Sequence, residues 1–262
     1  MAEDSRTHLP DGRKLDTRYI CVPSADLMTA SGMGTQALFG QRFDLMLSER
    51  GIADGALYSV IFGVERIDYI GTLSAAAVSE ALHEPTHRVD AVAAAIFKQA
   101  DIKSKLLGSL PRNASVQGVV KGDFLQMHTH GYIHLRHLKP IGVSSERHFT
   151  DVAADMLGLP YIWGGTGHIG VDCSGLVQSA LAATGVDAPR DTDQQEAGLG
   201  RDIDFSNREV GDLLFWPGHV GIVVEDDQLL HANAYHMSVA LEPVKTAVAR
   251  IGDVRSVKRL LG

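Results

Sequence analysis

Apolar residues repeat at helical spacing just after residue 173. They occupy positions i, i+1, i+4 and i+5 and are Leu176, Val177, Ala180 and Leu181. Because these positions share one face of a helix, and because Gly185 follows a run of good helix formers, the pattern predicts a helix that ends near Gly185. Cys173 would then lie in the first turn.

Three strand-like segments follow this predicted helix. Residues 211–216 and 219–224 are separated by Pro217 and Gly218, and residues 229–233 come after a short acidic turn. Proline and glycine break regular structure, so each segment is expected to be a separate strand of one sheet.

The register of these strands decides whether two histidines meet. If the loop after the second strand has an odd number of residues, Val224 pairs with Gln228. His231 then lies opposite Gly221, on the sheet face that carries His219. The two imidazoles become diagonal neighbours whose backbones are about 7 Å apart. We expect Gly221, which lacks a side chain, to leave room for one of the rings.

The N-terminal half alternates between short strand-like segments and turns rich in glycine or serine. A first group covers residues 19–22, 42–47, 57–62 and 67–73, and a second covers residues 88–97, 115–121, 124–128 and 131–134. Each group is typical of a small β-barrel. Residues 73–84 between the groups are rich in alanine, which predicts a short helix.

Cys173 and the two histidines form a candidate catalytic group. At a helix start, free amides and the macrodipole favour a thiolate, with Asp172 as the N-cap. A thiol near a histidine whose tautomer is fixed by a second polar group is the arrangement that acyl transfer requires. We expect Cys173 as nucleophile, His219 as base and His231 as orienter. The alternative is an unreactive buried cysteine beside two core histidines.

Four short motifs occur in a fixed order in the C-terminal part of the chain. They are residues 161–165, Asp172-Cys173-Ser174-Gly175, Gly218-His219-Val220-Gly221-Ile222 and Leu230-His231-Ala232. Together they resemble the NlpC family of papain-like bacterial cell-wall peptidases. The resemblance implies a catalytic triad of Cys173, His219 and His231, and a γ-D-glutamyl to diamino acid amide bond as the target.

The resemblance also implies substrate contacts around the nucleophile. In related peptidases the aspartate before the cysteine receives the free amino group of a terminal L-alanine, so Asp172 would do so here unless it is only a cap. Ser174 would hydrogen-bond to substrate or merely begin the helix, and Tyr161 would face the thiolate or pack in the core. Thr192 stands where a family serine contacts substrate. Arg190 would meet a substrate carboxylate or form a surface ion pair.

Two small barrels ahead of such a domain resemble the tandem bacterial Src-homology-3-like domains of muropeptide-trimming relatives. The similarity lies in their position and in Leu38-Phe39-Gly40. In related enzymes an acidic residue follows this motif, but here Gln41 follows it, so a charge contact with a substrate amine would be lost. Tyr69 occupies the place of a related tyrosine that contacts substrate.

Composition and charge exclude several other classes of protein. A formal net charge of -8 argues against a nucleic-acid partner. No apolar run is long enough to span a membrane, and residues 1–16 lack the apolar stretch of a secretory signal, which favours the cytoplasm. Cys21 and Cys173 do not suggest a disulfide framework. No metal or cofactor is expected. Four histidines lie close together in the sequence but need not converge on a metal ion, and they are His128, His130, His134 and His137.

These features together predict an α+β protein. We expect a lead-in at residues 1–17, β-barrels at residues 18–80 and 81–142, and a papain-like domain at residues 143–262. The expected activity is cleavage of the γ-D-glutamyl bond to meso-diaminopimelate or L-lysine in murein tripeptides or tetrapeptides with a free N-terminal L-alanine, during cell-wall recycling. The alternatives are an acyltransferase with the same triad and a non-catalytic module that binds wall peptides.

Overall fold

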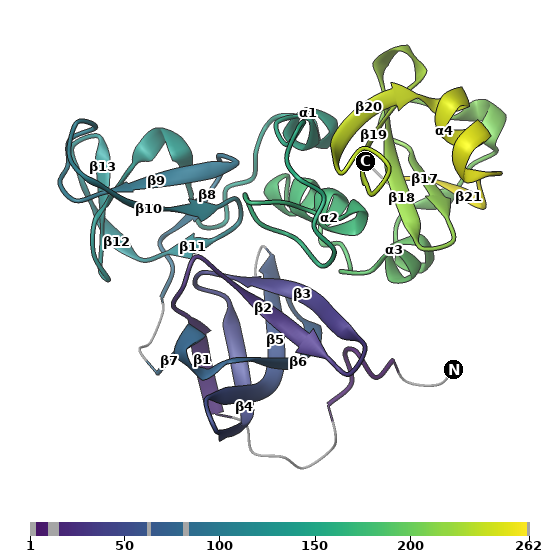
Figure 1. The fold of residues 1–262 in the computed structure, drawn as a ribbon. Coiled ribbons are helices and arrows are strands. Elements are labelled where there is room, and N and C mark those ends of the chain that lie inside the picture. The colour runs from purple at the N-terminus through teal and green to yellow at the C-terminus, as the bar shows by residue number, and fades with distance from the viewer. Residues whose placement is uncertain (1–3, 10–15, 62–63, 81–83, 261–262) are drawn as a thin grey trace. The chain divides into compact units, whose positions relative to one another are not determined.

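The structure is a computed structural model that describes residues 4–9, 16–61, 64–80 and 84–260. The chain divides into two compact units, Met1–Ser144 and Ser145–Gly262 (Figure 1). The first unit is built of strands with short 3-10 turns, and the second holds the four α-helices of the described residues. The predicted α+β class is confirmed.

The first part of the N-terminal unit is an antiparallel sheet of seven strands that curls around an apolar core. The strand order is β3-β2-β6-β5-β4-β1-β7. The strands are β1 (Asp16–Ile20), β2 (Ser24–Thr29), β3 (Gly32–Leu38), β4 (Arg42–Glu49), β5 (Ile52–Ile61), β6 (Val64–Ser74) and β7 (Val78–Ser79). Alternating apolar positions give the sheet one buried face, where Ile20, Leu27, Phe43 and Leu57 pack together.

Two glycines allow the sheet to curl tightly at its two longest strands. Gly55 in β5 pairs with Gly71 in β6. A Cβ atom at Gly55 would collide with the Asp44 carbonyl oxygen, and one at Gly71 would collide with the Met28 carbonyl oxygen. Close approach of neighbouring backbone therefore requires glycine at both positions.

The helix predicted for residues 73–84 is wrong within the described part of that range. Strand β6 continues to Ser74, a single 3-10 turn follows at Ala75–Ala77, and β7 comes next; residues 81–83 lie outside the described residues. Val78 pairs with Ile20, and Ala77 is buried in the core of the sheet. Tertiary pairing outweighs the helix propensity of the alanines, because propensity contributes less than about 1 kcal/mol per residue.

The second part of the N-terminal unit contains two smaller antiparallel sheets. Their orders are β10-β9-β14-β13-β12 and β11-β8-β15. The strands are β8 (His87–Val89), β9 (Ala93–Phe97), β10 (Leu106–Pro111), β11 (Ser115–Val116), β12 (Gly118–Lys121), β13 (Phe124–Met127), β14 (Tyr132–His134) and β15 (Leu138–Pro140). Phe39, from the turn after β3, packs into their shared core, and its carbonyl accepts from the Ser115 amide at 3.0 Å. The Leu38-Phe39-Gly40 motif thus joins the two parts of this unit.

The C-terminal unit combines a six-stranded antiparallel sheet with helices. The sheet order is β16-β21-β17-β18-β19-β20. The strands are β16 (Arg201–Asp202), β17 (Leu213–Trp216), β18 (His219–Val224), β19 (Gln228–Asn233), β20 (Ser238–Pro243) and β21 (Ser256–Arg259). The helices are α1 (Phe149–Ala154), α2 (Cys173–Ala183), α3 (Thr192–Gly198) and α4 (Val244–Ile251).

Two of these helices cover the sheet of the C-terminal unit. Helix α2 packs against β18 and β19, and α4 packs against β19 and β20 (Figure 1). The α4 contact buries Val244 and Ala247 with Leu229. In the part of the chain that the structure describes, no helix has both the length and the apolar character needed to cross a bilayer. The boundaries expected at residues 17, 80 and 142 stay predictions.

Candidate active site

Helix α2 begins at Cys173, as the apolar pattern predicted. Asp172 is its N-cap, and Oδ1 accepts from the Gly175 amide at 2.7 Å. Oδ2 of the same carboxylate accepts from the Gly164 amide at 2.9 Å. One carboxylate therefore caps the helix and fixes the preceding glycine-containing loop, so that the thiol is held at a defined place.

The thiol of Cys173 lies in a buried polar setting. Its Sγ is 3.7 Å from Oγ1 of Thr192 and 3.9 Å from the carbonyl oxygen of Gly218. Backbone amides of Ser174 and Val220 also hydrogen-bond to the sulfur. Since Gly218 and Val220 flank His219, these contacts bring the start of β18 against the start of α2.

Burial raises the pKa of the Cys173 thiol, and the nearby Asp172 carboxylate adds to this effect. The Thr192 hydroxyl and the two backbone amides act in the opposite direction, toward the thiolate. The expectation that the helix start makes a resting thiolate is therefore wrong in its net direction, because desolvation outweighs the amide bonds. The resting form is a neutral thiol that needs a base.

His219 and His231 meet as the strand parity predicted. Val224 pairs with Gln228 across β18 and β19, which puts both histidines on one face. Nε2 of His219 lies 2.9 Å from Nδ1 of His231. Nδ1 of His219 takes no part in this hydrogen bond. We expected the space beside Gly221 to hold a histidine ring, but the Leu229 side chain fills it. A Cβ atom at Gly221 would lie 2.7 Å from that side chain.

Both histidines are neutral at physiological pH. Burial lowers the pKa of His219 to about 3, and the charged forms of His231 and Arg250 contribute. Burial also lowers the pKa of His231 to about 3, again with a contribution from Arg250. A neutral imidazole has one nitrogen that can take a proton, so His219 can act as a base once its tautomer is set.

Arg190 is the buried partner of Asp172. Its guanidinium donates to Oδ2 of Asp172 at 2.7 Å, to Oδ1 at 3.1 Å and to Oγ of Ser174 at 2.8 Å. The Arg190 side chain is only 1% exposed. Of the two roles considered for Arg190, the surface ion pair is therefore wrong, and contact with a substrate carboxylate stays a prediction. Arg190 supports the start of α2 from within the fold.

Two further predicted substrate residues lie around the sulfur. Thr192 begins α3 and its hydroxyl contacts Sγ, as given above. Burial raises the pKa of Tyr161 to about 12, and the Asp172 carboxylate contributes, so the Tyr161 hydroxyl stays protonated and can donate. The structure thus gathers Tyr161, Asp172, Ser174 and Thr192 around Cys173, and their contacts with substrate stay predictions.

Gln41 and Tyr69 belong to the N-terminal unit. Oε1 of Gln41 accepts from the Leu38 amide at 2.6 Å and closes the turn that holds Phe39. Tyr69 is 8% exposed and packs in the core of the seven-stranded sheet. Both residues have structural roles in their own unit, and their contacts with substrate stay predictions.

Sequence reasoning missed two charged residues behind the histidines. Nε2 of His231 lies 2.9 Å from Oε1 of Glu242 in β20, and that same oxygen pairs with Arg250 in α4. No motif marks them. Strand alternation could have found Glu242. It pairs with Leu229 and therefore lies on the sheet face that carries His231. That inference would have required residues 238–243 to be predicted as a strand.

Comparison with known proteins agrees with this geometry. The NlpC/P60 family matches residues 158–251. The γ-D-glutamyl-L-lysine dipeptidyl-peptidase of Bacillus subtilis is 39% identical over 97 residues, which cover 34% of this chain and 32% of the relative. Dipeptidyl-peptidase 6 of Lysinibacillus sphaericus is 37% identical over 81 residues, covering 31% of this chain and 30% of the relative. The matches thus span about a third of the relatives' length.

A solved structure shares the fold of nearly the whole chain. It is an NlpC/P60 family protein from Bacillus cereus, with a TM-score of 0.79 at 19% identity, covering 94% of this chain and all of the other. At this identity the likeness supports the fold alone. Family match, fold and motif order agree, and the C-terminal unit of this chain therefore contains an NlpC/P60 domain.

Proposed function

We propose that this chain is a cysteine peptidase of murein peptides. It cleaves the γ-D-glutamyl bond to meso-diaminopimelate or L-lysine in short peptides with a free N-terminal L-alanine. The observation that carries the proposal is the pairing of His219 with His231 beside a thiol at the start of α2. The similarity to the γ-D-glutamyl-L-lysine dipeptidyl-peptidase of Bacillus subtilis supports the choice of bond.

The reaction proceeds through a thioester on Cys173. Nδ1 of His219 takes the thiol proton as the sulfur attacks the carbonyl carbon of the γ-D-glutamyl amide. Amides at the start of α2 donate to the oxyanion, and His219 then gives its proton to the departing amine. Water, deprotonated by His219, attacks the thioester and releases L-Ala-D-Glu with the free thiol.

Residues around the thiol recognise the L-alanyl end of the substrate. The Asp172 carboxylate meets the substrate ammonium, while Ser174, Tyr161 and Thr192 supply hydroxyl groups. Arg190 and the Gly164 and Gly175 amides already donate to the Asp172 carboxylate, so the ammonium would share oxygen atoms that these contacts hold in place. A role in cell-wall peptide recycling, in the cytoplasm, belongs to the same proposal.

Incubation with L-Ala-γ-D-Glu-meso-diaminopimelate is expected to release L-Ala-D-Glu and free diaminopimelate, detected by mass spectrometry. The N-acetylated tripeptide is the matched control, and we expect its kcat/KM to be at least about tenfold lower because it has no ammonium to meet Asp172. An intact tripeptide would contradict the proposal. Transfer of the dipeptide to an added amine without hydrolysis would instead indicate an acyltransferase.

The pH profile is expected to lack an acid limb near neutrality. His219 stays unprotonated down to about pH 3 because burial lowers its pKa. The value of kcat/KM at pH 5 should therefore stay close to that at pH 7, whereas an ordinary histidine would lose about 25-fold. Below pH 6.5 the histidines of the unfolded chain bind protons that the buried histidines do not, so the free energy of unfolding falls. Circular dichroism at each pH is therefore the control that the protein is still folded. A limb centred near pH 6.5 with intact fold would contradict this assignment.

A further inference from the structure

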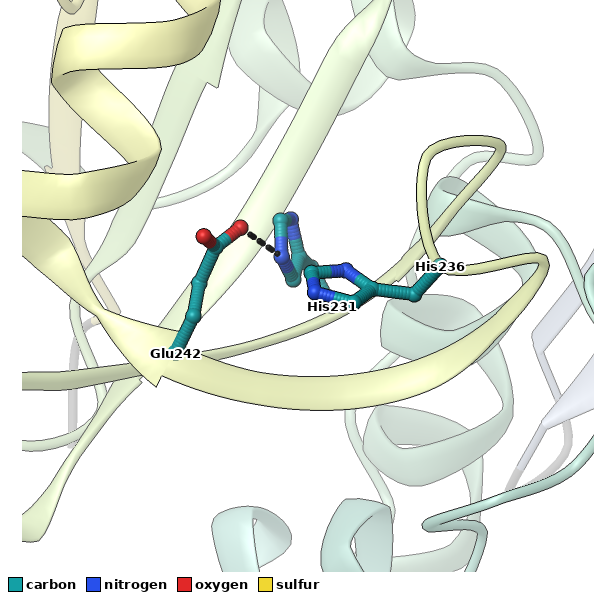
Figure 2. Close-up of side chains that lie close together, drawn as sticks. All are labelled: His231, His236 and Glu242. Atoms are coloured by element: carbon teal, nitrogen blue, oxygen red, sulfur yellow. Dashed lines mark hydrogen bonds and ion pairs between the residues drawn. The ribbon is translucent and has the colours of Figure 1, made fainter.

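A hydrogen-bonded series of side chains continues behind the two histidines. Nε2 of His219 lies 2.9 Å from Nδ1 of His231, and Nε2 of His231 lies 2.9 Å from Oε1 of Glu242. Figure 2 shows the carboxylate of Glu242 directed at the His231 ring. His231 is fully buried and Glu242 is 6% exposed, so water does not compete for these bonds.

The carboxylate determines which nitrogen of each ring carries the proton. An ionised carboxylate only accepts hydrogen bonds, so Nε2 of His231 must carry a proton and donate it. A neutral His231 then has an unprotonated Nδ1, which accepts. His219 must therefore donate from Nε2, and its Nδ1 keeps the lone pair. That is the nitrogen required to take the Cys173 proton.

Arg250 holds the Glu242 carboxylate in place. Its guanidinium pairs with Oε1 of Glu242, the oxygen that also meets His231. The guanidinium lies 4.3 Å from the centre of the Tyr235 ring, which fixes it from the other side. Glu242 is thus joined to α4 through a charge, and its position does not depend on its own strand alone.

The same side chains also have the composition of a metal site, but their bonds argue against one. Ligand atoms of His231, His236 and Glu242 lie within 4.8 Å of one another. Both ring nitrogens of His231 are already used, and the Arg250 cation is on the carboxylate. Nδ1 of His236 is 3.0 Å from Oδ1 of Asn233. A metal ion would have to displace these bonds beside an existing positive charge.

We propose that Glu242, held by Arg250, is a positioning residue that sets the tautomers of His231 and His219 and so directs the basic nitrogen toward Cys173. The proposal rests on the cysteine-peptidase function given above. When His219 takes up the thiol proton, the Glu242 charge also stabilises the imidazolium through His231. The expected cost of losing that charge is at least about tenfold in kcat, with little change in KM.

The test compares Glu242→Gln with Glu225→Gln, an exposed glutamate of the turn between β18 and β19. Both variants are made in a Cys21→Ala background, so that Cys173 is the sole thiol. Long-range proton–nitrogen NMR of histidine-labelled protein reports each tautomer, with His219→Ala and His231→Asn used to assign the signals. We expect the Nε2-protonated form for both rings in the parent and in Glu225→Gln, and a mixture in Glu242→Gln.

Alkylation of Cys173 by iodoacetamide provides a readout that needs no peptide substrate. We expect a rate at least about tenfold lower in Glu242→Gln at pH 7, and an unchanged rate in Glu225→Gln. If the parent fails to cleave the tripeptide but shows these tautomers and rates, the function is wrong and the positioning role stands. If folded Glu242→Gln keeps the tautomers and the alkylation rate of the parent, the positioning role is wrong. It is also wrong if EDTA treatment of the parent changes its tautomers and lowers its alkylation rate, since a metal ion would then hold the histidines.

Discussion

Replacing Cys173 with alanine is expected to lower kcat/KM for the tripeptide by about 10⁴-fold or more. The sulfur is the group that bonds to the substrate carbonyl, and the contacts of Thr192, Ser174 and Val220 around it cannot replace that bond. Initial rates of L-Ala-D-Glu release, measured at equal concentrations of folded protein, provide the comparison.

Cys21→Ala is the matched control for this substitution. Cys21 is an exposed free cysteine of the N-terminal unit, so the same chemical change is made outside the unit that carries His219 and His231. We expect its kcat/KM to equal that of the parent. A Cys173→Ala protein that retains activity within tenfold of the parent would show that another nucleophile carries the reaction.

Replacing Asp172 with alanine is expected to lower the free energy of unfolding by about 3 to 5 kcal/mol. The change leaves the Arg190 guanidinium buried without its carboxylate, and it also removes the cap of α2. Urea denaturation followed by circular dichroism measures the effect. The double variant Asp172→Ala, Arg190→Met should recover part of the loss, because no unpaired charge remains.

The exposed ion pair of Arg208 with Asp227 is the control for the buried one. The Asp227 side chain is 51% exposed, and Asp227→Ala should cost less than about 1 kcal/mol. An Asp172→Ala protein with parental stability and only a higher KM would mean that this carboxylate serves substrate binding alone. The ion pair of Asp172 with Arg190 would then contribute little to the free energy of unfolding.

Local patterns were enough to predict the central part of the site. The apolar spacing around Leu176 placed Cys173 at a helix start, and the count of residues after Val224 brought His219 and His231 to one face. Both inferences need only the period of a helix or a strand and one short turn. The resemblance to NlpC peptidases used the same residues, and the family match covers them.

What sequence reasoning missed depends on contacts between distant residues. The pairing of Arg190 with Asp172, and of Arg250 with Glu242, joins different elements through buried charges that no spacing rule specifies. The helix predicted for residues 73–84 failed because strand pairing with Ile20 outweighs alanine propensity. The helix start, which favours a thiolate, can be predicted from local sequence. The burial that raises the pKa of the Cys173 thiol depends on the whole fold and cannot.

An acyl group on Cys173 during turnover would show directly that this thiol is the nucleophile. An activated ester of L-Ala-γ-D-Glu acylates quickly, so that hydrolysis of the thioester limits turnover and the acyl-enzyme accumulates. Mixing with excess ester, acid quenching and peptide mass spectrometry locate the group. We expect one L-Ala-γ-D-Glu acyl group on the peptide containing Cys173, and it should disappear as L-Ala-D-Glu forms. Product formation with the acyl group on another residue, or with none on Cys173 during the first turnover, would contradict it.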